Sequence, residues 1–352
     1  MEKNNKKLIT LQKSLLFNVP ATTPTLKTYA IVDSLRDESV KEKIPWSGLN
    51  YLDLWHEDLW EHEQEVPVYL VELEEDNELT EYLLKNSDKD LAVYFVSPYR
   101  LEVLQHYYNF FTYPSINKEG FAQYGRKEIT PRGKEWSSKV YFGFYDANVL
   151  EDYIQTLYTK NKIDEFFVGV AMWLIPSSSD ESKLYIAFRD KDAQIDDVNL
   201  DLNQLLELEA PMLNFDTVSL PTVPNLEEYA HEVVLDLEQM QLFEQRHKRK
   251  FIDNVFLWAN NEGYTFYHSE ESNRQRAFEL FTEANTLGLE NEEAVYRYIV
   301  YALLVLTPMK ETNIYQKLRQ MPNEKTKTEL LNQEIWKVIK FQRRANGTTK
   351  TV

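Results

Sequence analysis

Two histidines and several carboxylates crowd the stretch Trp55-His-Glu-Asp-Leu-Trp-Glu-His62, a combination that could hold a zinc ion. A zinc-binding helix needs histidines at positions i and i+4, so that both imidazoles lie on one face. His56 and His62 are six positions apart and do not share a helical face. The other histidines follow no metal-binding motif, and the chain has no cysteine to supply a thiolate. We therefore predict no metal site.

Two aspartates, Asp33 and Asp146, each follow an apolar run that is typical of a strand. Enzymes of the α/β class often place acid–base groups at such strand ends. A helical pattern follows Asp146, however, so its carboxylate is better explained as an N-cap that accepts backbone N–H groups, and Asp33 could do the same. We predict capping, and we keep as the alternative a hydrolase or transferase that uses Asp33 or Asp146 with Arg36 or Arg100.

Motifs for other chemistries do not occur. Neither the G-x-G-x-x-G nor the G-x-x-x-x-G-K-[ST] phosphate cradle is present, and the chain has only 9 glycines from which to build one. The G-x-S-x-G nucleophile turn is missing too, and without cysteine there is no thiol nucleophile. We predict no catalytic residue and no cofactor, and hence a protein that is not an enzyme.

Charge and hydropathy narrow the possible partners. The 57 acidic and 39 basic residues give a formal net charge of −18, which opposes nucleic-acid binding because phosphate contacts depend on Lys and Arg. No apolar run reaches the roughly 20 residues that a membrane helix requires, and the N-terminus is a poor signal peptide. We expect a cytoplasmic protein without stable membrane insertion.

Aromatic residues are the best candidates for contacts with another protein. Trp46, Tyr51, Trp55 and Trp60 lie in an acidic stretch without a clear strand pattern. Tyr and Trp dominate the binding energy of many interfaces, so these four residues are partner-binding candidates if they are exposed. Simple core packing is the competing interpretation, because exposed Trp clusters are uncommon in monomers.

Short apolar runs alternate with helical patterns over the first two-thirds of the chain, as in mixed α/β units. The predicted helices span 78–85, 101–111 and 149–162. The predicted strands span 28–32, 68–73, 91–96, 140–145, 168–175 and 184–188. Residues 116–138 carry several glycines and indicate a long loop or irregular hairpin.

The last third has a helical pattern only. Apolar positions from Leu226 to Met240 trace one helical face. Gly288 can end one helix in the left-handed conformation, and Asn291 can cap the next. We predict an α/β domain with a mixed sheet and flanking helices at 20–190, an acidic, proline-containing linker at 191–224, and an all-α lobe at 225–345.

Five segments in order resemble a known family. They are Tyr29-Ala-Ile-Val-Asp33-Ser-Leu-Arg36, Val68-Tyr-Leu-Val-Glu-Leu73, Leu91 to Ser97, Phe142-Gly-Phe-Tyr-Asp146-Ala-Asn-Val-Leu150 and Phe166-Phe-Val-Gly-Val-Ala-Met-Trp-Leu174. This series is similar to the adaptor proteins, or effector chaperones, of bacterial type VI secretion systems. The similarity covers about residues 26–176.

The resemblance implies an adaptor in the cytoplasm of a Gram-negative bacterium. It would bind the N-terminal region of a toxic effector and deliver it to the spike (VgrG-type) protein, without being exported itself. The residues that form the structural motif would be Tyr29, Asp33, Arg36, Glu72, Tyr145, Asp146 and Trp173. Tyr99 and Arg100 join the partner-binding candidates. An immunity protein that inhibits a toxin is the alternative.

Overall fold

The computed structural model divides into two compact units, Met1–Phe243 and Glu244–Val352, which we call unit 1 and unit 2. The residues that the structure describes are 2–17, 25–54, 68–112, 114–117, 119–120, 126–130, 133–137, 142–176, 183–189, 195–201, 233–305 and 307–345. None of the helices in these ranges combines the length and the hydrophobicity of a membrane-spanning segment.

Unit 1 contains a seven-stranded sheet in the order β10-β9-β8-β4-β1-β3-β2. The strands are β1 (Lys27–Asp33), β2 (Tyr51–Asp53), β3 (Val68–Leu73), β4 (Ala92–Ser97), β8 (Met172–Pro176), β9 (Lys183–Arg189) and β10 (Ile195–Asp201). Every neighbouring pair is antiparallel, with Tyr29 opposite Glu72 on one side and opposite Phe95 on the other. The predicted α/β domain is confirmed, although its sheet is antiparallel throughout and not mixed.

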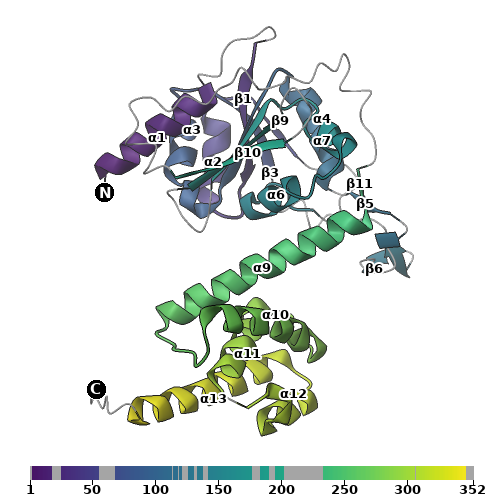
Figure 1. Cartoon of the computed structure of the whole chain (residues 1–352). Coiled ribbons are helices and arrows are strands. Elements are labelled where there is room, and N and C mark those ends of the chain that lie inside the picture. Colours follow the sequence, from purple (N-terminus) through teal and green to yellow (C-terminus); the bar gives the residue numbers. More distant parts are fainter. Residues whose placement is uncertain are drawn as a thin grey trace. The chain divides into compact units, whose positions relative to one another are not determined.

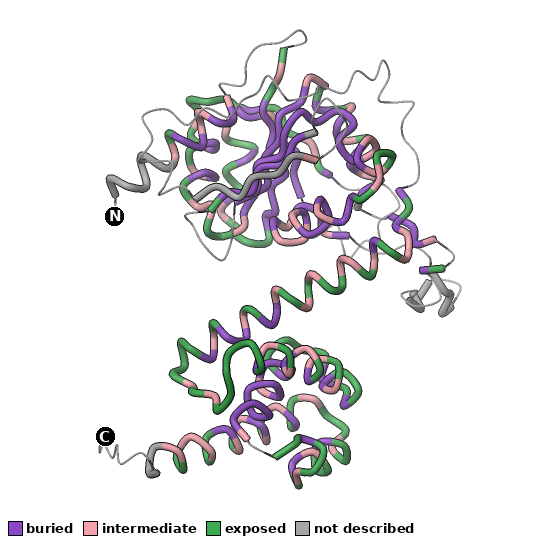
Figure 2. Tube along the Cα trace, viewed as in Figure 1, coloured by how far each residue is buried: buried purple, intermediate pink, exposed green. Residues whose placement is uncertain are grey.

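Helices cover both faces of this sheet (Figure 1). The helices α1 (Glu2–Phe17), α2 (Glu38–Trp46) and α3 (Glu78–Lys85) cover one face. The helices α4 (Leu101–Thr112), α6 (Ala147–Ile154) and α7 (Lys160–Phe166) cover the other. Because side chains alternate along a strand, Tyr29 and Ile31 of β1 enter one core, and Ala30 and Val32 enter the opposite core. The buried strands in the middle of Figure 2 reflect this covering on both sides.

Most predicted elements of unit 1 occur near their expected bounds, with two corrections. Phe142–Tyr145 forms turns and not a strand, because the N–H of Phe144 bonds to the carbonyl of Phe142 and that of Asp146 bonds to Gly143; residues 140–141 lie outside the described ranges. The single helix predicted at 149–162 is two helices, since Thr159 caps α7 separately.

Smaller elements complete unit 1. The short helix Ser87–Lys89 precedes β4, and a hairpin of β6 (Arg126–Thr130) and β7 (Gly133–Ser137) lies within the predicted 116–138 loop or hairpin. The linker predicted at 191–224 includes β10, which pairs with β9; its residues 202–224 lie outside the described ranges.

Residues just before unit 2 differ from the prediction. β11 (Val234–Leu235) pairs in parallel with β5 (Ser115–Ile116), so the expected helical face from Leu226 does not include Val233 to Leu235. The long helix α9 (Leu237–Asn261) then spans the division between the units. Residues 225–232, where the helical lobe is predicted to start, lie outside the described ranges.

Unit 2 is helical, in agreement with the predicted fold class. It consists of α9 from Glu244 onward, followed by α10 (Glu270–Thr286), α11 (Glu292–Leu304), the short helix Met309–Glu311, α12 (Asn313–Gln320) and α13 (Glu324–Ala345). α11 is buried on nearly every side and forms the centre of the core. Two predicted signals are confirmed: Asn291 caps α11, and Gly288 has a positive φ of 67°.

Candidate functional site

Three of the predicted motif residues meet at the end of β1. Nη2 of Arg36 lies 2.6 Å from Oδ2 of Asp146, and its Nε lies 3.6 Å from Oδ2 of Asp33. Asp33 is the last residue of β1, and Asp146 directly precedes α6. Arg36 therefore joins the sheet to a helix whose capping residue lies 110 positions further along the chain.

Backbone N–H groups occupy the remaining oxygens of these carboxylates. Oδ1 of Asp146 accepts hydrogen bonds from the N–H of Asn148 at 2.9 Å and of Val149 at 3.2 Å. The predicted N-cap role of Asp146 is thus confirmed. Oδ1 of Asp33 accepts from the N–H of Leu35 at 2.9 Å, which closes a turn. Asp33 caps no helix, because Asp37 caps α2 instead.

Burial determines the electrostatics of this cluster. The pKa of Asp33 is raised above its ordinary value, mainly because burial disfavours the charged form; the N–H of Leu35 and the guanidinium of Arg36 act in the opposite direction. The Asp33 side chain is only 6% exposed. A substrate would have to displace the bonds of Leu35 and Arg36 to reach it, so the geometry suits a structural joint better than acid–base chemistry.

Tyr29 and Glu72 lie opposite each other on the neighbouring strands β1 and β3. The hydroxyl of Tyr29 donates to the carbonyl of Tyr99 at 2.6 Å, and burial, with Glu72 nearby, raises the pKa of Tyr29. Glu72 pairs with Lys27 at 2.6 Å. The carbonyl of Tyr99, a predicted partner residue, thus accepts a hydrogen bond within unit 1. Arg100, the other candidate, is exposed just before α4.

The other two motif residues lie in the core. Trp173 of β8 is fully buried and stacks on Phe166 with ring centroids 5.5 Å apart. It also contacts Phe95 at 4.9 Å. Tyr145 is 9% exposed and packs edge-on against Phe144. These residues hold α6 and α7 against the sheet.

Two of the four residues of the predicted aromatic patch lie within the described ranges. Trp46, the last residue of α2, is 89% exposed. Tyr51 of β2 is 36% exposed and packs against Tyr69, with ring centroids 5.8 Å apart. Trp55 and Trp60 lie outside the described residues.

Two exposed aromatics of α13 were missed from the sequence. Trp336 and Phe341 of α13 are 68% and 71% exposed, whereas Leu331 and Ile335 of the same helix are buried. The helical period could have identified them, because Leu331 and Ile335 define the buried stripe and Trp336 falls beside it. Their location adds a second surface with contact residues typical of interfaces.

No group of three or more His, Asp or Glu that could hold a metal ion occurs within the described ranges. Comparison with known proteins gives no relative: no family model, no curated protein and no solved structure matches the chain.

Proposed function

We propose that the chain is a non-catalytic adaptor of the type VI effector-chaperone kind. It binds the N-terminal region of an effector protein in the cytoplasm of a Gram-negative bacterium and helps to load that effector onto the VgrG-type spike. Nucleic acid is not its ligand. The proposal combines the ordered motifs of residues 26–176 with the surface chemistry of unit 1.

The observation that carries the proposal is the exposure of Trp46. A tryptophan that is 89% exposed leaves a large apolar ring in water. Burying such a ring on a partner is worth about 2 kcal/mol or more, and Trp is among the residues most enriched in binding hot spots. Trp46 is the last residue of α2, and the buried residues Val40 and Ile44 anchor this helix in the core. The helix therefore fixes the position from which the Trp46 ring projects.

The joint around Arg36 supports the same proposal. The residues that carry the family resemblance, Asp33, Arg36 and Asp146, act together to fix β1 and α6. Their side chains satisfy one another and nearby backbone N–H groups. A scaffold that binds a polypeptide requires elements fixed in this way, because its function is to hold a partner.

A binding experiment tests the proposal. The purified chain is mixed with the toxin encoded beside its gene, and complex formation is followed by gel filtration and titration calorimetry. We expect a stable complex with the wild-type chain and an affinity about 30-fold lower for Trp46→Ala, which is the cost of one hot spot. Tyr267→Ala removes an exposed ring from unit 2 as the matched control and should bind like the wild type.

Two results would count against an adaptor. One is the absence of a complex with any neighbouring effector candidate. The other is a complex in which the toxin's activity is blocked and its secretion is independent of the chain, which would indicate an immunity protein. Loss of effector secretion on deletion of the gene would support loading.

A further inference from the structure

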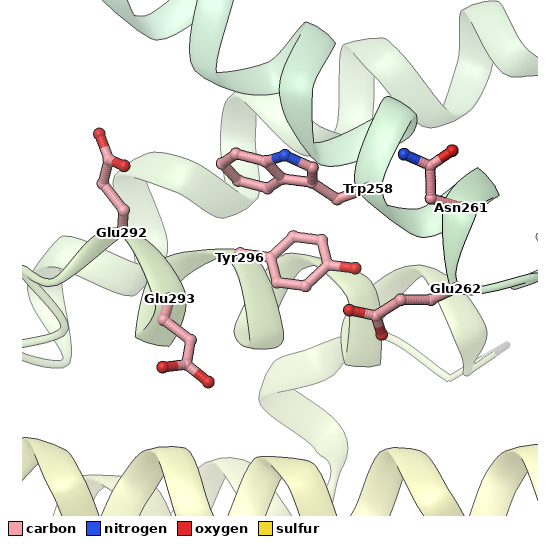
Figure 3. A pocket seen from close by; sticks show the side chains of 6 residues that line it. All are labelled: Trp258, Asn261, Glu262, Glu292, Glu293 and Tyr296. Carbon is pink, nitrogen blue, oxygen red and sulfur yellow. The ribbon is translucent and has the colours of Figure 1, made fainter. Parts of the chain in front are cut away.

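A pocket of about 360 Å³ lies in unit 2, between the end of α9 and the first turns of α11 (Figure 3). Trp258, Asn261 and Glu262 line it from the α9 side. Glu292, Glu293 and Tyr296 line it from α11. Every charged residue in this lining is a carboxylate.

Two aromatic rings form the inner wall of the pocket. Trp258 and Tyr296 meet edge-to-face, with ring centroids 5.4 Å apart and planes at 89°. Tyr296 is only 4% exposed. Its hydroxyl is buried, and Figure 3 shows it directed toward the side of Glu262, the carboxylate with which it interacts. The hydroxyl oxygen can still accept a hydrogen bond from a ligand.

Carboxylates surround these rings, and the guanidinium of Arg297 neutralises only part of their negative charge. Nη1 of Arg297 bonds to Glu262 at 2.9 Å, and its Nε lies 3.9 Å from Glu293. Burial raises the pKa of Glu262, but hydrogen bonds from Tyr264 and Arg297 outweigh it and lower the pKa overall. Glu262 is therefore charged at neutral pH. Glu292 has no ion-pair partner among the described residues, so negative charge remains in excess at this site.

We propose that this pocket receives an arginine side chain from the bound polypeptide. A guanidinium can stack on Trp258 while its N–H groups donate to the nearby carboxylates and to the hydroxyl of Tyr296. Arg297 already shows that the site accepts this group, since its Cζ lies 4.9 Å from the centre of the Tyr296 ring. The partner's chemistry is thus a basic segment; its identification as a bound effector rests on the proposed function.

The geometry favours a guanidinium over a metal ion. A metal ion needs several ligands converging on one point, and the described residues contain no such group. The carboxylates here are separated by two aromatic faces, which bind a broad organic cation better than a compact one.

The test uses the full chain and two matched probes, N-acetyl-arginine amide and N-acetyl-citrulline amide. The second has nearly the same shape but no charge. Titration followed by NMR of the tryptophan indole signals, with Trp258→Phe to assign one of them, should show arginine amide binding with a Kd on the order of millimolar. Citrulline amide should leave the spectrum unchanged.

Charge-removing variants locate the site. Glu292→Gln with Glu293→Gln should weaken binding of arginine amide by about three- to ten-fold. The control, Glu271→Gln with Glu279→Gln, removes the same charge from exposed positions of α10 and should bind like the wild type. Equal binding of both probes, or equal weakening by both double variants, would overturn the proposal.

The effector experiment separates the two proposals. If the chain binds its effector but not arginine amide, the pocket proposal fails and the adaptor proposal stands. If it binds arginine amide through Glu292 and Glu293 but no effector, the pocket proposal stands and the adaptor proposal fails.

Discussion

Replacing Asp146 separates its two roles, capping and ion pairing. Asp146→Ala removes the acceptor for the N–H groups of Asn148 and Val149, which costs about 1 kcal/mol. It also removes the ion pair with Arg36, worth about 0.5 kcal/mol because the Arg36 side chain is 45% exposed. Asp146→Asn keeps an acceptor at the cap and loses only the ion pair. We expect about 1.5 kcal/mol for the first variant and about 0.5 kcal/mol for the second.

Hydrogen exchange is the appropriate assay, because a chain with two compact units need not unfold in one step. Amides of α6 should exchange about ten-fold faster in Asp146→Ala than in the wild type and only about two-fold faster in Asp146→Asn. The amides of α3, which Asn77 caps independently, should not change. Equal effects of the two variants would refute the capping argument, as would an unchanged α6 in both.

Three further predictions concern stability. The pKa of Asp37 is lowered to about 2, first by the hydrogen bond from Tyr82 and then by Ser39. The stability that the charged Asp37 contributes is therefore fully present above about pH 4 and is lost as the pH falls toward 2. In acid titrations followed by circular dichroism, the stability of Asp37→Asn should fall by about 1 kcal/mol less than that of the wild type over this range. Lys162→Met removes a 2.7 Å ion pair with Asp236 and should speed exchange at the start of α9 more than at α13. Gly288→Ala places a side chain at φ 67° and should lower the urea stability of unit 2 by about 1 kcal/mol, whereas Thr286→Ala should have a smaller effect.

Local patterns in the sequence predict much of this fold. The strand Val68–Leu73 and the helix Glu78–Lys85 have the expected bounds, and the caps at Asp146 and Asn291 occur as predicted. These features depend on side-chain periodicity and on hydrogen bonds between near neighbours, which a short window contains.

Features that depend on distant contacts could not be predicted in this way. Phe142, Phe144 and Tyr145 are all buried, so the segment has the apolar pattern of a strand although its backbone forms turns. Val234–Leu235 is extended because it pairs with Ser115–Ile116, which is remote in the sequence. Strand direction is likewise a property of the whole sheet.

Strand direction also decides how the two candidate aspartates should be understood. An enzyme that uses both aspartates would need a cleft at the carboxyl ends of neighbouring strands, an arrangement that parallel strands produce. In the antiparallel sheet, Asp33 at the end of β1 lies opposite Val68 at the start of β3, and Asp146 belongs to no strand. The two carboxylates meet through Arg36 instead. Two carboxylates that approach each other through a shared cation are expected where two structural elements are joined. Substitutions at such a joint should first lower the stability of the elements that it connects. The comparison of Asp146→Ala with Asp146→Asn measures this loss of stability directly.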